Sequence, residues 1–185
     1  MNAINRVSKK IVLSIVAAVV FATPAAAVFE GDTAPSWEGT TFEGETYSFP
    51  AMAKGKPTVV IFWASWCSYC KAFMPYLKKV EQEYGTEFIE IVAVNMKEEQ
   101  EGESDPKEYI ENTGIALTAI QDGDEIAAAY NVRFVPGLMV LGDDGTVLYR
   151  RGMSKLPAGQ EIAELWYEKV RAALDQEFED ILAGC

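Results

Sequence analysis

Histidine is absent from the 185-residue sequence, and cysteine occurs only three times. Without an imidazole, the chain cannot carry out Ser-His-Asp or Cys-His catalysis, bind zinc through histidine or attach a c-type haem. Three cysteines are also fewer than the four thiolates that hold an iron–sulfur cluster. The sequence therefore predicts no metal and no cofactor, and chemistry that does not depend on histidine.

Basic side chains are scarce as well, with 16 Lys and Arg against 28 Asp and Glu and a formal net charge of −12. Nucleic-acid binding relies on Lys and Arg that displace counterions from phosphates, so the composition predicts no nucleic-acid partner. The remaining composition, 49% hydrophobic and 24% charged, is that of an ordinary globular domain.

The first 27 residues have the pattern of a secretory signal peptide. Arg6, Lys9 and Lys10 precede an apolar run over 11–22, and small residues follow as far as Ala27. We expect cleavage after Ala27, which leaves a soluble periplasmic domain of residues 28–185 with 13 basic and 28 acidic side chains. The alternative is an uncleaved membrane anchor, because the 19 residues of 11–29 approach the length of a membrane span.

Residues 28–185 alternate between strand and helix patterns. A small hairpin is expected over 41–49, and β-branched or aromatic runs predict strands at 58–63, 88–95, 116–119, 138–142 and 146–150. Apolar spacing and capping residues predict helices at 67–84, 106–113 and 124–130 and a long final helix from Pro157 onward. This order predicts one α/β domain with a central mixed β-sheet and helices on both faces.

The chemical feature of the sequence is Cys67-Ser68-Tyr69-Cys70, where the strand at 58–63 meets the helix that follows. Two thiols on the first turn of a helix can close a short disulfide, and the helix N-terminus stabilises a thiolate there. Cys67 is therefore the predicted nucleophile and Cys70 the resolving thiol. The alternative is a purely structural disulfide. The third cysteine, Cys185, is predicted to be a free thiol of the tail or part of an intermolecular bridge.

Several blocks resemble the TlpA/ResA/CcmG-like exported thiol:disulfide oxidoreductases of the thioredoxin superfamily. The matching blocks are residues 34–37, 55–70, 93–95, 130–137 and 144–147. The resemblance implies a thioredoxin fold with an N-terminal β-hairpin and a βα insertion around 96–120. It also implies that Val135-Pro136 is a cis peptide facing the thiols, with the backbone of Val135 free to pair with an extended substrate.

Two aromatic side chains, Trp66 and Tyr69, belong to the motif and are predicted to contact substrate, with simple packing as the alternative. Many thioredoxins carry an Asp six residues before the first Cys, and some TlpA-like proteins carry a Glu three residues after the second, to move the proton of the resolving thiol. The corresponding positions here are Ile61 and Phe73. Water or another carboxylate must then take this role, and Glu98 is the candidate acid/base. Its alternative interpretation is part of a solvated acidic surface.

The predicted function is exchange of electrons between the Cys67–Cys70 pair and the cysteines of another exported protein. Ser68-Tyr69 contains neither histidine nor a cation, which favours a reductase over a strong oxidant. The resemblance implies apocytochrome cysteines, as in cytochrome c biogenesis, or a sulfur-metabolism protein as substrate. A membrane or periplasmic protein is the expected electron donor. The alternatives are a disulfide oxidase or isomerase and a redox-inert peptide-binding module.

Overall fold

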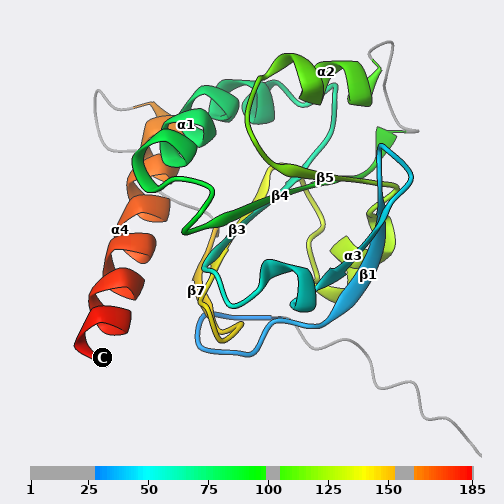
Figure 1. The fold of residues 1–185 in the computed structure, drawn as a ribbon. Helices are drawn as coiled ribbons and strands as arrows, with labels where there is room; N and C mark the ends of the chain where they lie inside the picture. The colour runs from blue at the N-terminus through cyan, green and yellow to red at the C-terminus, as the bar shows by residue number, and fades with distance from the viewer. Residues whose placement is uncertain (1–27, 99–104, 153–160, 185) are drawn as a thin grey trace, which may run out of the picture.

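A computed structural model of the chain describes residues 28–98, 105–152 and 161–184 (Figure 1). Within these residues seven strands form one sheet in the order β2-β1-β5-β4-β3-β6-β7. The strands are β1 (Trp37–Thr41), β2 (Thr46–Phe49), β3 (Thr58–Trp63), β4 (Glu90–Asn95), β5 (Thr118–Gln121), β6 (Gly137–Leu141) and β7 (Val147–Arg150). The helices are α1 (Ser68–Tyr84), α2 (Pro106–Asn112), α3 (Asp124–Ala129) and α4 (Ile162–Ala183), with one 3-10 turn, η1 (Ala51–Ala53).

The central strand is β3, whose six residues are all buried. It runs parallel to β4 and antiparallel to β6, and β4 in turn runs parallel to β5. A strand covered on both faces needs apolar side chains at every position, which explains the uninterrupted β-branched and aromatic run in the sequence. The antiparallel hairpin β1-β2 and the antiparallel pair β6-β7 complete the two sides of the sheet.

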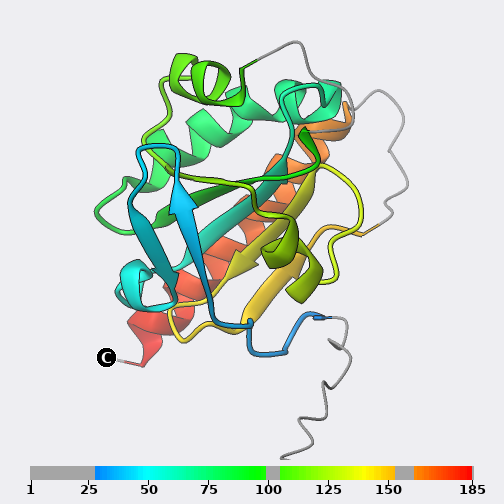
Figure 2. The same ribbon diagram turned by 90° about the vertical axis from the view of Figure 1, so that its right-hand side faces the viewer.

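Helices cover both faces of the sheet (Figures 1 and 2). On one face, Ile61 and Trp63 of β3 pack with apolar residues of α1, α2 and α4. On the other face, Val60 and Phe62 pack with α3, the N-terminal segment and the hairpin. Alternate residues of one strand therefore support two separate hydrophobic cores, and the predicted mixed α/β sheet with helices on both faces is confirmed.

Element boundaries differ from the sequence-based expectations at several ends. The strand expected at 116–119 lies at Thr118–Gln121, where residue 118 pairs with Val92 of β4. The run expected at 88–95 enters the sheet only at Glu90. Pro75 lies inside α1, and the helix continues past it to Tyr84. The final helix begins at Ile162 and extends to Ala183.

The strand order brings two segments together that are far apart in the sequence. Trp63 ends β3 just before α1 begins, and Gly137 begins β6 immediately after Pro136. Because β3 and β6 are antiparallel neighbours with Phe62 opposite Gly137, the end of β3 lies beside the start of β6. The loop that carries the two cysteines and the segment that carries Pro136 therefore lie next to each other.

The predicted signal peptide and Cys185 lie outside the described residues, so both remain predictions. Among the residues that the structure does describe, no helix combines the length and the apolar character that a bilayer crossing requires.

Candidate active site

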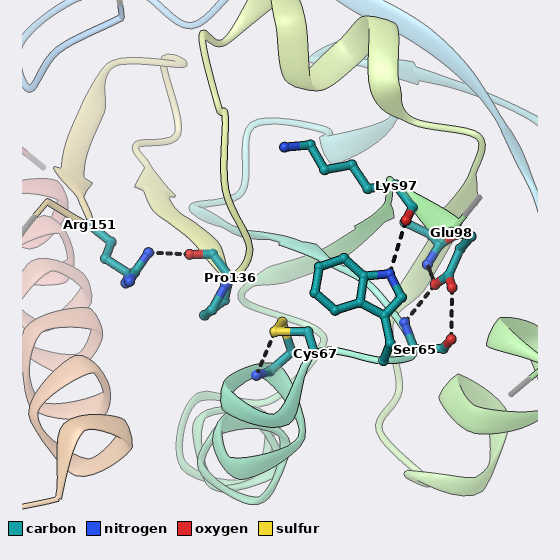
Figure 3. The surroundings of a disulfide bond; sticks show 9 residues. Ser65, Cys67, Lys97, Glu98, Pro136 and Arg151 are labelled. Atoms are coloured by element: carbon teal, nitrogen blue, oxygen red, sulfur yellow. Dashed lines mark hydrogen bonds between the residues drawn. A yellow bond between two sulfur atoms is a disulfide. The ribbon is translucent and has the colours of Figure 1, made fainter. Parts of the chain in front are cut away.

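Cys67 and Cys70 form a disulfide across the first turn of α1, with their Cα atoms 5.2 Å apart. Cys67 is the N-cap residue of the helix, in extended backbone conformation, and its Sγ accepts a hydrogen bond from the backbone N–H of Cys70 at 3.1 Å (Figure 3). Cys67 retains 4% of its surface exposed, whereas Cys70 is fully buried. Cys67 is therefore the cysteine that a partner molecule reaches first.

The peptide bond between Val135 and Pro136 is cis, which is the geometry that the family resemblance implies. Figure 3 shows Pro136 facing Cys67. Val135 is partly buried against the core cluster that contains both cysteines. In the described part of the chain, the backbone N–H and C=O of Val135 have no hydrogen-bond partner.

Three basic side chains hold the segment 130–136 through its backbone carbonyl groups. Arg150, at the end of β7, donates to the carbonyl oxygens of Tyr130 and Asn131 at 2.9 and 3.1 Å. Arg151 donates to the carbonyl oxygen of Pro136, and Lys97 donates through Nζ to the carbonyl oxygen of Arg133. Charged donors form stronger hydrogen bonds than neutral ones, so these contacts restrict the position of the segment opposite the disulfide.

Trp66 is half-buried, and its indole Nε1 donates to the carbonyl oxygen of Lys97 at 2.9 Å. Lys97 follows β4 and adopts a left-handed backbone conformation with φ of 59°, which is uncommon for a residue with a side chain. Because Lys97 also reaches the segment around Pro136, it connects the loop before Cys67 with the segment opposite it. This connection places Trp66 at the rim of the site.

Tyr69 lies between the two cysteines and is 61% exposed. Its ring makes an edge contact with Trp166 of α4, with 6.4 Å between the centroids. Trp166 itself is almost fully buried, as expected for a core residue. Tyr69 therefore presents an aromatic face to solvent directly beside the disulfide. Its predicted contact with substrate stays a prediction.

The carboxylate of Glu98 is engaged by three donors. The backbone N–H of Ser65 donates to Oε1 at 2.6 Å, the Ser65 hydroxyl donates to Oε2 at 2.7 Å, and the amide Nδ2 of Asn95 donates to Oε1 at 2.5 Å. No hydrogen bond between described residues joins Glu98 to either sulfur atom. Glu98 thus supports the loop before Cys67, and its acid/base role remains a prediction.

The two positions at which the family resemblance implies a proton-transferring carboxylate, Ile61 and Phe73, are apolar and fully buried. Ile61 and Phe73 belong to the same core cluster as Cys70. Among the described residues, no group of three or more His, Cys, Asp and Glu side chains is arranged to hold a metal ion. The chemistry that this arrangement offers is that of the cysteine pair.

Sequence reasoning missed four site residues, namely Ser65, Lys97, Arg150 and Arg151. Their roles depend on contacts with segments distant in sequence: 33 positions separate Ser65 from Glu98, and 36 separate Lys97 from Arg133. One available signal was the Arg-Arg pair at the end of a strand in a strongly acidic chain. For Lys97, nothing in the sequence indicated a left-handed conformation.

The family model described as AhpC/TSA family matches residues 30–150. "Thioredoxin-like protein YneN" of Bacillus subtilis (strain 168) is 31% identical over 118 residues, which are 64% of this chain and 68% of that protein. "Thiol-disulfide oxidoreductase ResA" of Geobacillus kaustophilus (strain HTA426) is 30% identical over 128 residues, which are 69% of this chain and 71% of that protein.

Solved structures with a similar fold include the thioredoxin domain of a thiol-disulfide oxidoreductase from Bacteroides vulgatus. It superimposes with a TM-score of 0.63 at 20% identity and covers 80% of this chain and 99% of that one. An uncharacterized conserved protein from Geobacillus kaustophilus gives a TM-score of 0.69 at 24% identity, with 82% of both chains covered. At these identities the structural similarity shows a shared fold. The assignment of thiol-disulfide oxidoreductase activity rests on the relatives found by sequence.

Proposed function

We propose, from the premise that this chain belongs to the AhpC/TSA family, that it reduces cysteines of another exported protein. The chain is a thioredoxin-like thiol:disulfide oxidoreductase. The observation that carries the proposal is the Cys67–Cys70 disulfide on the first turn of α1, with Cys67 outermost.

The exchange step follows from the positions of the two sulfur atoms. In the reduced protein, the thiolate of Cys67 attacks one sulfur of the partner disulfide; a mixed disulfide forms, and the other partner sulfur leaves as a thiolate that takes up a proton. Cys70 then loses its proton and attacks the Sγ of Cys67, which closes the disulfide and releases the second partner thiol. The partner gains two electrons, and the Cys67–Cys70 pair loses two.

Three features support this assignment of roles. The helix N-terminus stabilises negative charge on the sulfur of Cys67, which is the N-cap residue. Cys70 is fully buried one turn inward, so it reacts after the partner is already attached. The unpaired backbone of Val135 offers hydrogen-bonding groups to an extended partner segment, and Trp66 and Tyr69 offer aromatic surface beside it.

The reducing direction rests on the residues between the cysteines. Neither Ser68 nor Tyr69 adds positive charge beside Cys67, so the loop does not stabilise the thiolate to the degree that makes a strong oxidant. We propose apocytochrome cysteines or a sulfur-metabolism protein as substrate and a membrane or periplasmic protein as electron donor. A reduction potential as high as that of strong disulfide donors would instead identify an oxidase or isomerase.

The proposed compartment is the periplasm, on the strength of the signal-peptide pattern of residues 1–27. Mass spectrometry of the exported protein tests this part. A mature chain that begins at Val28 is the expected result, an intact N-terminus would favour the membrane anchor, and retention in the cytoplasm would overturn the proposal.

The experiment that tests the function is substrate trapping. In Cys70→Ser the resolving thiol is lost, so the mixed disulfide on Cys67 should accumulate and identify the partner by mass spectrometry. Cys67→Ser is the matched control and should trap far less. Wild-type protein should also reduce insulin disulfides; a protein inactive in both assays would instead be a redox-inert binding module.

A further inference from the structure

Arg151 lies directly after β7, between two aromatic rings beside the site. Its Cζ is 4.4 Å from the ring centroid of Trp166 and 5.2 Å from that of Phe134. The guanidinium donates to the carbonyl oxygen of Pro136, and Figure 3 shows Arg151 and Cys67 on either side of Pro136. A cation is therefore positioned next to the backbone segment that would receive a partner chain.

Among the described residues, the partners of this cation are a backbone carbonyl group and two aromatic rings. The ion pairs between described residues do not include Arg151, although the chain carries 28 acidic side chains. The nearby carboxylate of Glu30 accepts a hydrogen bond from the backbone N–H of Arg150 instead. The Nε of Arg151 is buried without a hydrogen-bond partner, and burial lowers the pKa of its guanidinium.

The surroundings of Arg151 add further positive charge and apolar surface. Arg133 and Arg150 line the same small hollow, of about 30 Å³, as Arg151. Phe134, whose ring Arg151 contacts, is 54% exposed, and the exposed Tyr69 makes an edge contact with Trp166, the other ring beside Arg151. A partly desolvated guanidinium gains more from a carboxylate than from a carbonyl group, because the charge-assisted pair is stronger.

We propose that Arg151 is a specificity-determining residue that favours partner segments with an aspartate or glutamate beside the reactive cysteine. The proposal rests on the proposed function, because it concerns the partner of the same site. The acidic chain as a whole repels acidic partners at long range, so the preference comes from local contact with Arg151. A competing explanation is that Arg151 only positions Pro136, which would affect every partner equally.

The test uses a matched set of cysteine peptides, each joined by a disulfide to a small neutral thiol and differing only in an Asp, Asn or Lys beside the cysteine. The rate constant for reaction with the reduced protein is measured for each peptide. For wild type we expect the Asp peptide to react about 5- to 10-fold faster than the Lys peptide, the size of a single partly exposed charge contact. The two rate constants of this Asp-to-Lys ratio are measured with one protein sample. The ratio therefore does not depend on the fraction of folded protein.

Three variants assign the preference to its source. Arg151→Gln should bring the Asp-to-Lys ratio close to one, and Arg151→Lys should keep part of it because the charge remains. Arg171→Gln is the matched control, since Arg171 lies on the exposed side of α4 and pairs with Glu83 and Asp175. It should retain the wild-type ratio.

The outcomes separate this inference from the proposed function. Exchange at equal rates with all three peptides, or a ratio that survives Arg151→Gln, would overturn the role of Arg151 and leave the oxidoreductase function intact. A wild-type protein that reacts with none of the peptides would overturn the proposed function, and this inference with it.

Discussion

The carboxylate of Glu98 accepts hydrogen bonds from both the backbone N–H and the side-chain hydroxyl of Ser65, at 2.6 and 2.7 Å. Ser65 precedes Cys67 by two residues, so a side chain from the loop after β4 determines where the cysteine loop lies. The contact joins two segments that follow neighbouring parallel strands, β3 and β4. The Ser65–Glu98 contact therefore both stabilises the fold and positions the loop that carries Cys67.

Replacing this carboxylate should destabilise the protein. In Glu98→Gln, the charged acceptor of these hydrogen bonds becomes a neutral amide with a single accepting oxygen, so we expect the free energy of unfolding to fall by about 1–3 kcal/mol. Denaturant unfolding of the oxidised protein measures it. Glu87→Gln makes the same change at an exposed residue between α1 and β4 and should have little effect. Equal stability of the two variants would contradict the structural role of Glu98.

The same Glu98→Gln protein tests the predicted acid/base role. A carboxylate that accepts the proton of Cys70 contributes its own titration to the pH dependence of exchange, so its removal should change the pH profile. A lower rate with an unchanged profile would mean that Glu98 only positions the loop, and water would then be the proton acceptor.

A side chain at Gly137 should disturb the segment opposite the disulfide. An added Cβ would lie 2.6 Å from Cγ1 of Val132 and 3.1 Å from Cβ of Phe62, both too close. We expect Gly137→Ala to lower the free energy of unfolding by about 1–3 kcal/mol, because Val132 or the backbone beside Pro136 must shift. A shift of that backbone should slow exchange. Gly152→Ala is the control, since no atom of the residues that the structure describes lies within 4 Å of its added Cβ. Adding Val132→Ala to Gly137→Ala should restore part of the rate; no recovery would contradict the steric explanation.

The buried carboxylate of Glu177 should affect stability without affecting exchange. This residue of α4 is only 9% exposed, and its Oε1 accepts from the backbone N–H of Asp143 at 2.8 Å in the β6-β7 turn. Removing the acceptor in Glu177→Ala should cost about 1–3 kcal/mol of unfolding free energy, whereas Glu177→Gln keeps an acceptor and should cost less. Exchange rates should not change, because this turn follows Leu141, at the opposite end of β6 from Pro136. A slower exchange in folded Glu177→Ala protein would contradict this separation.

Stability should decline at alkaline pH. Burial raises the pKa of Tyr149 from 10.0 to about 12, and burial also raises the pKa of Tyr109 and Tyr130. The unfolded chain loses these protons near pH 10 while the folded chain still holds them, so their contribution is complete below pH 10 and is lost as the pH rises toward 12. Denaturant unfolding at several pH values in this range measures the loss. Tyr149→Phe should make the decline shallower, and an equally steep decline would contradict the assignment to Tyr149.

The sequence alone was sufficient for the strand-helix order and for the cysteine pair at the end of β3, whereas Pro136 became a candidate site residue through the family resemblance. The first two features depend on local patterns: a continuous apolar run for β3, apolar residues every three or four positions for α1, and two cysteines on one helical turn. Local patterns predicted strand boundaries poorly where these depend on pairing with a neighbouring strand. An example is β5, whose first residue is set by its register with β4.

The supporting contacts of the site were decided only by the tertiary structure. The contacts of Glu98 with Ser65, of Lys97 with Arg133 and of Arg151 with Pro136 join different loops. Each requires that two loops be placed to within the length of a hydrogen bond, and that placement comes from sheet order and core packing. Local residue patterns identified the cysteine pair because one turn of helix carries both residues. The side chains that hold the surrounding segments came together only when β3, β4 and β6 paired.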